Sequence, residues 1–322
     1  DVTAYKDGWH GDTSRMFKFG KIPVKAKKLI DTTMGSGAQI IGHNNPLIKK
    51  ISKQIKKGTV YTIPNCYTKD VNKYNLTPLD GITNSTFVVA VDDKKYVLRI
   101  PGKNPDEINR ESEKYNTSLV VDSGLTLPFI VFDEKSGIKI SEYFDIYTYK
   151  KTDFNNFELR KNAFNQLKKL HKSGLIFKDN FKPVEVFQNI TDITHPLERD
   201  ASDLCFHIVE QLNNIGMDFM PCHQDLHHGN FVIYNEQTFL IDWEYSSMGD
   251  PYFDYADMFW QNEFNHVLNL RNNSLSEIDI NTSEQIDKFQ YFEILSMITW
   301  GLWAMRKFPE DTKGEEVLKK AI

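Results

Sequence analysis

The sequence has few cysteines, and the three present, Cys66, Cys205 and Cys222, are scattered without C-x-x-C spacing. This pattern predicts neither a disulfide framework nor a zinc site, and it favours a reducing cytoplasm. Long hydrophobic runs are also missing, since no apolar stretch approaches the ~20 residues that a membrane-spanning helix needs, and no signal peptide is recognisable. The net charge of −5 gives no reason to expect a nucleic-acid partner. We therefore expect a cytoplasmic protein with no membrane or nucleic-acid partner.

The remaining composition is that of a folded globular protein. Of the 322 residues, 40% are hydrophobic and 26% are charged, which excludes a disordered chain. The length indicates about two domains of ordinary size. No internal repeat or low-complexity linker separates them, and the sequence gives no indication of an oligomeric state.

From Leu76 onward the pattern predicts a strand-rich region followed by a helical one. Predicted strands in the first region are Thr86–Val91, Lys95–Ile100, Leu127–Phe132 and Ile138–Glu142, with a polar helix around Asp106–Leu119. In the second region, apolar residues at helical spacing from Leu159 to Leu170 predict a helix that Gly174 ends. Strands return only at Phe231–Tyr234 and Thr238–Asp242. A β-rich lobe followed by a helical lobe with one hairpin is typical of a two-lobed kinase.

The segment His223-Gln-Asp-Leu-His-His-Gly-Asn230, followed by Ile241-Asp242-Trp-Glu, indicates phosphoryl transfer. Such a reaction needs a carboxylate to orient and deprotonate the attacking hydroxyl, and oxygen ligands to hold Mg²⁺ on the phosphates. We predict that Asp225 is the base and that Asn230 and Asp242 are catalytic metal ligands. We expect His223 to brace the loop by hydrogen bonding rather than to act as a base.

The stretch CHQDLHHGNFVIYNEQTFLIDWEYSSMGDPYFDYADMF resembles the core of choline/ethanolamine kinases, above all the bacterial choline kinases. The family pattern Asp-Trp/Phe-Glu-Tyr with a later Asp is matched by Asp242, Glu244, Tyr245 and Asp254. This resemblance implies an α+β, two-lobed protein-kinase-like fold, with a nucleotide-binding lobe at 75–142 and a catalytic, alcohol-binding lobe at 143–322. It also implies an ATP- and Mg²⁺-dependent enzyme that phosphorylates choline or a related amino-alcohol.

The same resemblance implies roles for residues outside the catalytic core. Expected nucleotide-binding residues are Gly81, Thr83, Asn84, Ser85, Arg99, Glu113, Glu142 and Tyr143. Glu113 would hold Arg99 against the phosphates, and the segment that ends with Glu142 and Tyr143 would be the adenine-binding hinge. Taken alone, the Gly81–Ser85 segment also fits an ordinary hairpin turn.

The alcohol pocket is expected around Trp300 and Trp303, which lie three residues apart on one helix face. Without the resemblance, this pair would be interpreted as a core stripe. Indole faces suit a quaternary ammonium, which donates no hydrogen bonds. The expected substrate residues are Glu244, Tyr245, Tyr252, Glu263, Trp300 and Trp303. Gln261 stands where relatives often carry an acid, so ethanolamine or another amino-alcohol stays open as the substrate.

The first part of the chain does not fit a kinase. Residues 30–65, with a Gly-His-x-x-Pro before a helix that Pro46 begins and Gly58 ends, resemble the N-terminal segment of class III PLP-dependent aminotransferases. The catalytic lysine of such enzymes would lie far beyond this segment. We therefore interpret 1–74 as an aminotransferase-like appendage without PLP chemistry.

Three alternatives to a choline or ethanolamine kinase remain at this point. An aminoglycoside- or sugar-directed kinase would share the catalytic loop. A non-catalytic kinase-like module attached to an aminotransferase would have lost activity, against which the intact Asp225, Asn230 and Asp242 argue. A PLP enzyme would form a lysine Schiff base.

Overall fold

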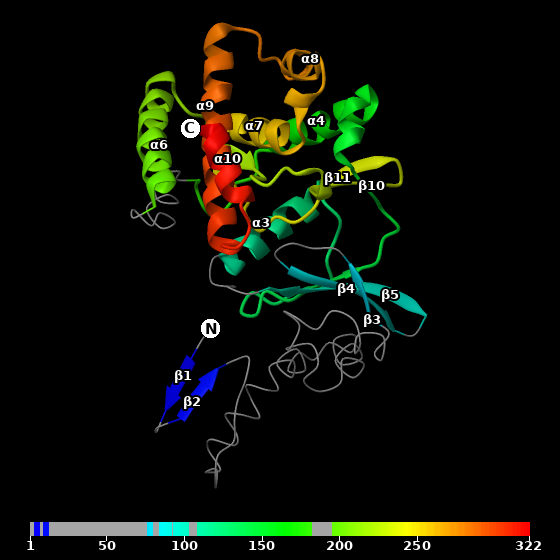
Figure 1. Cartoon of the computed structure of the whole chain (residues 1–322). Coiled ribbons are helices and arrows are strands. Elements are labelled where there is room, and N and C mark those ends of the chain that lie inside the picture. Colours follow the sequence, from blue (N-terminus) through cyan, green and yellow to red (C-terminus); the bar gives the residue numbers. More distant parts are fainter. Residues whose placement is uncertain are drawn as a thin grey trace. The chain divides into compact units, whose positions relative to one another are not determined.

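The computed structural model of the chain describes residues 3–6, 9–12, 76–79, 84–91, 93–102, 108–181 and 195–322. The chain divides into two compact units, each built from two stretches of sequence. The first contains Asp1–Glu107 and Pro128–Tyr143, and the second contains Ile108–Leu127 and Phe144–Ile322. Figure 1 shows a strand-rich first unit and a mainly helical second unit.

A five-stranded antiparallel sheet, in the order β3-β4-β5-β7-β6, forms the first unit. Its strands are β3 (Leu76–Leu79), β4 (Asn84–Val91), β5 (Lys94–Pro101), β6 (Val131–Phe132) and β7 (Lys139–Glu142). In the tight turn between β4 and β5, Asp93 has a φ of 64°, a left-handed conformation that Asp adopts more readily than most residues. The predicted strands Thr86–Val91 and Lys95–Ile100 are confirmed and pair as this hairpin.

The alternation of side chains along these strands gives the sheet one buried face. Phe87 and Val89 on β4 lie two residues apart and are buried, as are Leu98 on β5 and Ile140 on β7. Residues two apart on a strand point to the same side of a sheet. The β-branched and aromatic residues that predicted strands thus supply a single apolar layer.

Two elements between β5 and β7 in the sequence are bounded differently from the prediction. The strand expected over 127–132 is reduced to β6, although Ile130 N still donates to Ile140 O at 2.7 Å. The helix expected around 106–119 is α3 (Arg110–Asp122), which belongs to the second unit. It begins late because the Asn109 side chain accepts a hydrogen bond from Ser112 N and caps the first turn.

The N-terminal segment is described only at a small hairpin. Strand β1 (Thr3–Lys6) pairs antiparallel with β2 (Trp9–Asp12). The helix predicted between Pro46 and Gly58 and the aminotransferase-like segment lie outside the described residues.

Most of the second unit is helical. Its longer helices are α3, α4 (Phe157–His171), α6 (Pro196–Ile215), α7 (Pro251–Gln261), α8 (Leu270–Glu277), α9 (Ser283–Lys307) and α10 (Lys313–Ala321). Short 3-10 turns are η6 (Lys151–Asn155), η7 (His228–Asn230) and η8 (Phe264–His266). Helix α4 confirms the prediction from Leu159 to Leu170, and Gly174 follows it with a left-handed φ of 71°.

A short hairpin sets the position of the predicted catalytic residues. Strand β10 (Phe231–Tyr234) pairs with β11 (Gln237–Leu240), and β8 (Tyr147–Thr148) pairs with the other edge of β10. The turn residues Asn235 and Glu236 both have positive φ, which suits a tight hairpin. Because the strands are antiparallel, the residues before β10 and after β11 meet at the same end, where Ile241 N donates to Asn230 O at 3.0 Å. A second small pair, β9 (Met220–Cys222) with β12 (Ser247–Gly249), lies at the start of the catalytic loop.

Helix α9 packs against both α7 and α10 in this unit (Figure 1). Phe259 on α7 stacks on Phe264 at 4.5 Å between ring centroids and meets Phe289 of α9 at 5.1 Å. Helix α10 approaches α9 closely at Gly314, where a Cβ atom would lie 2.6 Å from Met305 N. None of the described helices combines the length and apolar character that a membrane crossing requires.

Candidate active site

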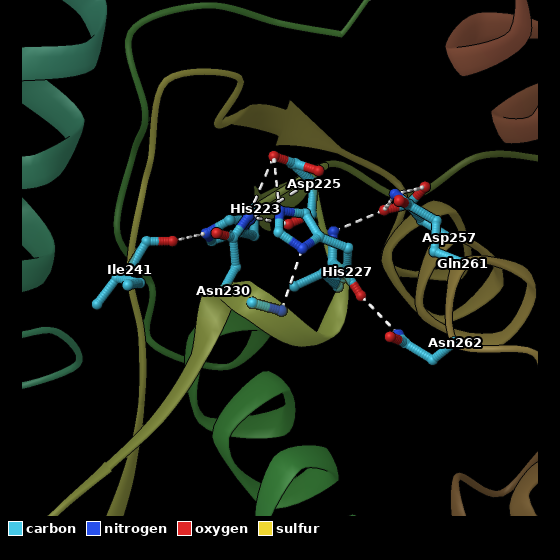
Figure 2. A network of polar contacts seen from close by, with 10 residues as sticks. His223, Asp225, His227, Asn230, Ile241, Asp257, Gln261 and Asn262 are labelled. Atoms are coloured by element: carbon cyan, nitrogen blue, oxygen red, sulfur yellow. Dashed lines mark hydrogen bonds and ion pairs between the residues drawn. The ribbon is translucent and has the colours of Figure 1, made fainter. Parts of the chain in front are cut away.

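The loop from His223 to Asn230 lies between β9 and β10 and carries the predicted base. Asn230 Nδ2 donates to the carboxylate Oδ2 of Asp225 at 3.0 Å and to the backbone oxygen of Asp225 at 2.8 Å (Figure 2). These two bonds fix the Asp225 side chain against its own backbone. Since Nδ2 of Asn230 is committed as a donor, its Oδ1 is the atom chemically able to bind a cation.

Asp254 anchors the start of this loop from helix α7. Its carboxylate is fully buried and accepts hydrogen bonds from His223 N at 3.0 Å and Gln224 N at 2.8 Å. It also contacts His171 Nε2 at 2.8 Å. Gln224 has a φ of 66°, so the backbone is strained one residue before the base. The sequence analysis noted Asp254 in the family pattern but gave it no role.

His223 braces the loop, as the sequence analysis expected. Its Nε2 donates to Ile241 O at 2.8 Å, and its Nδ1 accepts from Asp225 N at 3.3 Å. The ring packs on Trp243 at 4.7 Å between centroids. Burial lowers the pKa of His223, so the neutral imidazole links the catalytic loop to the segment that carries Asp242.

A group of carboxylates surrounds Asp242. Carboxylate oxygens of Asp242, Glu244 and Glu113 lie within 4.8 Å of one another. Arg110 Nη1 is 2.5 Å from Glu113 Oε2 and 3.2 Å from Glu244 Oε2, and all three of these side chains are buried. Arg110 thus contacts two of the three carboxylates, and hard oxygen donors such as carboxylates suit Mg²⁺. The described residues therefore fit the metal that the sequence implied.

Nearby carboxylates, two of them from this group, also act on the predicted base. Burial raises the pKa of Asp225 well above its ordinary value. The negative charges of Asp257, Asp242 and Glu244 raise it further, while the hydrogen bond from Asn230 opposes the shift. A carboxylate whose pKa is raised accepts a proton more readily, which is the requirement for a general base.

Three of the predicted substrate residues form one aromatic cluster. The ring centroids of Tyr245 and Trp300 lie 5.1 Å apart, and those of Trp300 and Trp303 lie 5.5 Å apart. Both contacts are edge-to-face, with interplanar angles of 84° and 77°. Both indoles are partly exposed, and Glu244 directly precedes Tyr245 in the sequence. Electron-rich faces beside a carboxylate suit a bound ammonium group.

Tyr252 and Glu263 have other partners. Lys288 Nζ lies over the Tyr252 ring at 4.8 Å from its centroid. Glu263 is half exposed and pairs with Lys151 at 2.6 Å and with His266 at 3.7 Å. Gln261 donates from Nε2 to both carboxylate oxygens of Asp257 at 2.9 Å. The roles of Tyr252 and Glu263 in binding the alcohol stay predictions.

The predicted nucleotide residues lie mostly in the first unit. Asn84 and Ser85 open β4 and pair with Pro101 and Ile100 of β5. Arg99 is buried on β5, where its guanidinium donates to Gly137 O at 3.5 Å. Gly81 and Thr83 lie outside the described residues.

The predicted hinge ends the first unit. Tyr143 N donates to Lys95 O at 3.1 Å directly after Glu142, the last residue of β7. Glu113 belongs to α3 of the second unit, where it pairs with Arg110 at 2.5 Å. Its pairing with Arg99 stays a prediction.

Several site residues escaped the sequence analysis. Arg110 and Asp257 carry charge into the site, and Ser296 and Asn262 bond to groups beside it. Each acts across a long sequence separation, so no local motif marks it. Spacing on α7 offered the one available signal, because Asp254 and Asp257 are three residues apart and share a helix face.

Comparison with known proteins places this site in context. The family model for choline/ethanolamine kinase matches residues 77–288. Protein LicA from Haemophilus influenzae is 31% identical over 190 residues, which cover 55% of this chain and 55% of that protein. The chain therefore spans about half the length of this curated relative.

Solved structures are similar to this chain over a longer stretch than the curated relative. The choline kinase LicA from Streptococcus pneumoniae has a TM-score of 0.68 and 27% identity, covering 78% of this chain and 94% of that one. LicA in complex with AMP has a TM-score of 0.67 and 28% identity, covering 76% and 89%. The fold is thus the two-lobed, protein-kinase-like α+β fold that the sequence implied.

A separate short match concerns another class of enzyme. Methionine aminopeptidase from Rickettsia prowazekii is 46% identical over 44 residues, which cover 13% of this chain and 17% of that protein. The match reaches only a small part of that enzyme. The aminotransferase resemblance of residues 30–65 stays a prediction.

Proposed function

Because the chain belongs to the choline/ethanolamine kinase family, we propose that it transfers the γ-phosphoryl group of ATP to the hydroxyl group of choline or a related amino-alcohol. The observation that carries this proposal is the junction at one end of the β10–β11 hairpin. There Asn230 clamps the carboxylate of Asp225, and Ile241 N bonds to Asn230 O directly before Asp242. Base and metal-binding groups are therefore held by one short element.

In the proposed reaction, the Asp225 carboxylate accepts the proton of the substrate hydroxyl. The hydroxyl oxygen forms a bond to the γ-phosphorus while the bond from that phosphorus to the β–γ bridging oxygen breaks, and ADP leaves. The raised pKa of Asp225 favours the proton transfer. Asn230 orients the carboxylate during this step through its two hydrogen bonds.

We assign Mg²⁺ to Asn230 and Asp242, with the neighbouring carboxylates of Glu244 and Glu113 adding negative potential. When bound, the ion neutralises negative charge on the phosphates of ATP. When Mg²⁺ is absent, Arg110 neutralises part of the negative charge of Glu113 and Glu244. The buried carboxylates are then partly paired before the nucleotide arrives.

The amino-alcohol is proposed to bind at the cluster of Tyr245, Trp300 and Trp303. A quaternary ammonium cannot donate hydrogen bonds, so aromatic faces and a nearby carboxylate are the groups able to attract it. Glu244 supplies that carboxylate, because it lies beside Tyr245 and close to Asp242. The same cluster would admit ethanolamine, whose primary ammonium can also donate hydrogen bonds to carboxylates.

ATP is proposed to bind through the first unit. The candidates are Gly81, Thr83, Asn84, Ser85, Arg99, Glu142 and Tyr143, with Glu113 from the second unit. A related LicA structure contains AMP, which supports a nucleotide site in this fold. The proposal places the reaction in the cytoplasm, where ATP is available and where buried thiols such as Cys205 and Cys222 stay reduced.

A coupled ADP-release assay tests the proposal. The acceptors are choline, ethanolamine, serinol and an aminoglycoside, each with Mg²⁺ and with excess EDTA. We expect ADP release that depends on choline or ethanolamine and that EDTA abolishes. Release that responds only to the aminoglycoside would overturn the assignment.

The metal assignment is tested with Asp242→Ala. This variant should require a higher Mg²⁺ concentration for half-maximal rate, because one of the proposed ligands is lost. Asp279→Asn is a matched control, since Asp279 is 84% exposed and pairs only with Lys168 among the described ion pairs. An unchanged Mg²⁺ dependence in Asp242→Ala would exclude this residue as a ligand.

A further inference from the structure

Helix α7 and its C-cap residue Asn262 hold both backbone groups of Leu226, the residue that follows the proposed base. Leu226 N donates to Asp257 Oδ2 at 2.6 Å, and Asn262 Nδ2 donates to Leu226 O at 2.9 Å. In Figure 2, Asp257 and Asn262 lie on the side of the loop opposite Ile241. Leu226 is fully buried. The peptide beside Asp225 is therefore fixed from α7 as well as from the β10–β11 hairpin.

Asp257 is in turn bonded to helix α9. Ser296 Oγ donates to Asp257 Oδ1 at 2.6 Å and accepts from Trp260 Nε1 at 2.8 Å. Asp257 and Ser296 are both completely buried. Ser296 lies four residues before Trp300, on the same helix face. An unbroken chain of hydrogen bonds thus runs from the loop backbone to the helix that carries both indoles.

The carboxylate of Asp257 accepts several hydrogen bonds in its buried position. Burial of a carboxylate is costly unless such bonds compensate for the lost hydration. Asp257 is surrounded by donors from three elements: the loop, its own helix through Gln261, and α9. A fully bonded buried network of this kind fixes the relative position of the elements that it joins.

We propose that Asp257 and Ser296 are positioning residues. They couple Trp300 and Trp303, the proposed amino-alcohol-binding residues on α9, to the proposed base Asp225. This inference rests on the proposed function, because it assigns α9 to the acceptor. The carboxylate of Asp257 sets where Leu226, and hence Asp225, lies relative to Trp300. Loss of the Ser296 hydroxyl leaves Asp257 short of one donor and Trp260 Nε1 without its acceptor. Asp225 and the indole pair on α9 are then no longer held in a fixed position relative to each other.

Hydrogen exchange of the full chain tests this coupling without any ligand. In Ser296→Ala, backbone amides of the loop from Gln224 to Asn230 should exchange about tenfold faster than in the native chain, because a buried hydrogen bond is lost. Ser296→Thr keeps the hydroxyl and should restore slow exchange. Ser274→Ala is the matched control: Ser274 is also fully buried, and its hydroxyl has no hydrogen-bond partner in the described part of the chain.

Kinetics give the second measurement. In Ser296→Ala, the ratio of ADP released to phosphorylated amino-alcohol formed should rise, and KM for the alcohol should rise with it. KM for ATP should stay at the native value. A purely structural role would leave this ratio unchanged and alter only the melting temperature, which is measured in parallel.

The two measurements separate the coupling from the function on which it rests. A native chain that shows no amino-alcohol-dependent turnover would overturn the proposed function, while loop exchange would still decide whether Ser296 holds the loop. If Ser296→Ala and Ser274→Ala show the same loop exchange and the same product ratio, the coupling is wrong.

Discussion

At the scale of single residues, Asp225 is the group on which turnover should depend most directly. Asp225→Asn keeps an oxygen that can accept from Asn230 Nδ2, so the loop geometry should survive. The amide cannot take the hydroxyl proton, and loss of a positioned general base lowers turnover by about 10²-fold or more. We therefore expect ATP affinity to persist while kcat falls, measured by ADP release and by nucleotide binding. Near-native turnover would contradict the role of this carboxylate.

His227 gives the loop a defined dependence on pH. Its Nδ1 accepts a hydrogen bond from Gly229 N at 3.1 Å, so this nitrogen carries no proton in the native state. Burial lowers the pKa of His227 to about 4. An unfolded histidine titrates near 6.5, so between these values the unfolded chain binds more protons than the folded one. The contribution of His227 to stability is present above pH 6.5 and is lost as the pH falls toward 4.

The variant His227→Asn tests this dependence, because asparagine also caps a helical turn but does not titrate. The fall in the free energy of unfolding between pH 6.5 and pH 4 should be smaller than in the native chain by on the order of 1–3 kcal/mol. Urea denaturation at several pH values measures it. His266→Asn, at a side chain that is 67% exposed, is the control. Equal slopes in the two variants would show that His227 does not titrate as described.

At the scale of elements, helix α9 carries Trp300 and Trp303. A substitution at Trp303 distinguishes a role in binding the amino-alcohol from a role in packing alone. Trp303→Ala should raise KM for choline about 30-fold and leave KM for ATP unchanged, because a desolvated cation–π contact contributes about 2 kcal/mol. Ethanolamine should suffer less, since its primary ammonium can still bond to Glu244. KM values for both alcohols, together with the melting temperature, test this expectation.

The opposite outcome has an equally clear signature. If Trp303 is only packing, its removal should cost about 3–5 kcal/mol of stability and lower activity toward both alcohols alike. Trp303→Phe, which keeps an aromatic face, is the matched control. Its choline-to-ethanolamine ratio of KM should remain close to the native ratio.

At the scale of the whole molecule, the choline/ethanolamine kinase match begins at residue 77. A chain that starts at residue 75 should therefore keep the native KM for ATP and for the amino-alcohol and the native kcat. The five-stranded sheet starts with Leu76, so no described strand of that sheet is lost. The same ADP-release assay measures the effect. A large loss of kcat in the shortened chain, with its melting temperature unchanged, would show that residues 1–74 contribute to the reaction.

The sequence by itself determined the parts that local chemistry controls. The hairpin around Asn235 and the spacing of Asp225, Asn230 and Asp242 follow from short stretches of chain. In these, turn residues and β-branched strands restrict the backbone directly. Helix α4 could also be predicted from the sequence, because its apolar residues repeat at helical spacing. The start of α3 at Arg110 could not be predicted, since the polar residues before Asn109 fit a helix as well.

Only the tertiary structure decided which distant side chains meet. The contact of Lys288 with the ring of Tyr252 could not be predicted from the sequence, and the role of Tyr252 at the alcohol stays a prediction. Ser296 carries no motif, and it matters because α9 packs across α7 and brings its hydroxyl to Asp257. Arg110 similarly meets Glu244 across 134 positions of sequence. Such pairings depend on how the helices pack, and packing is set by the combined burial of many side chains rather than by any short stretch of sequence.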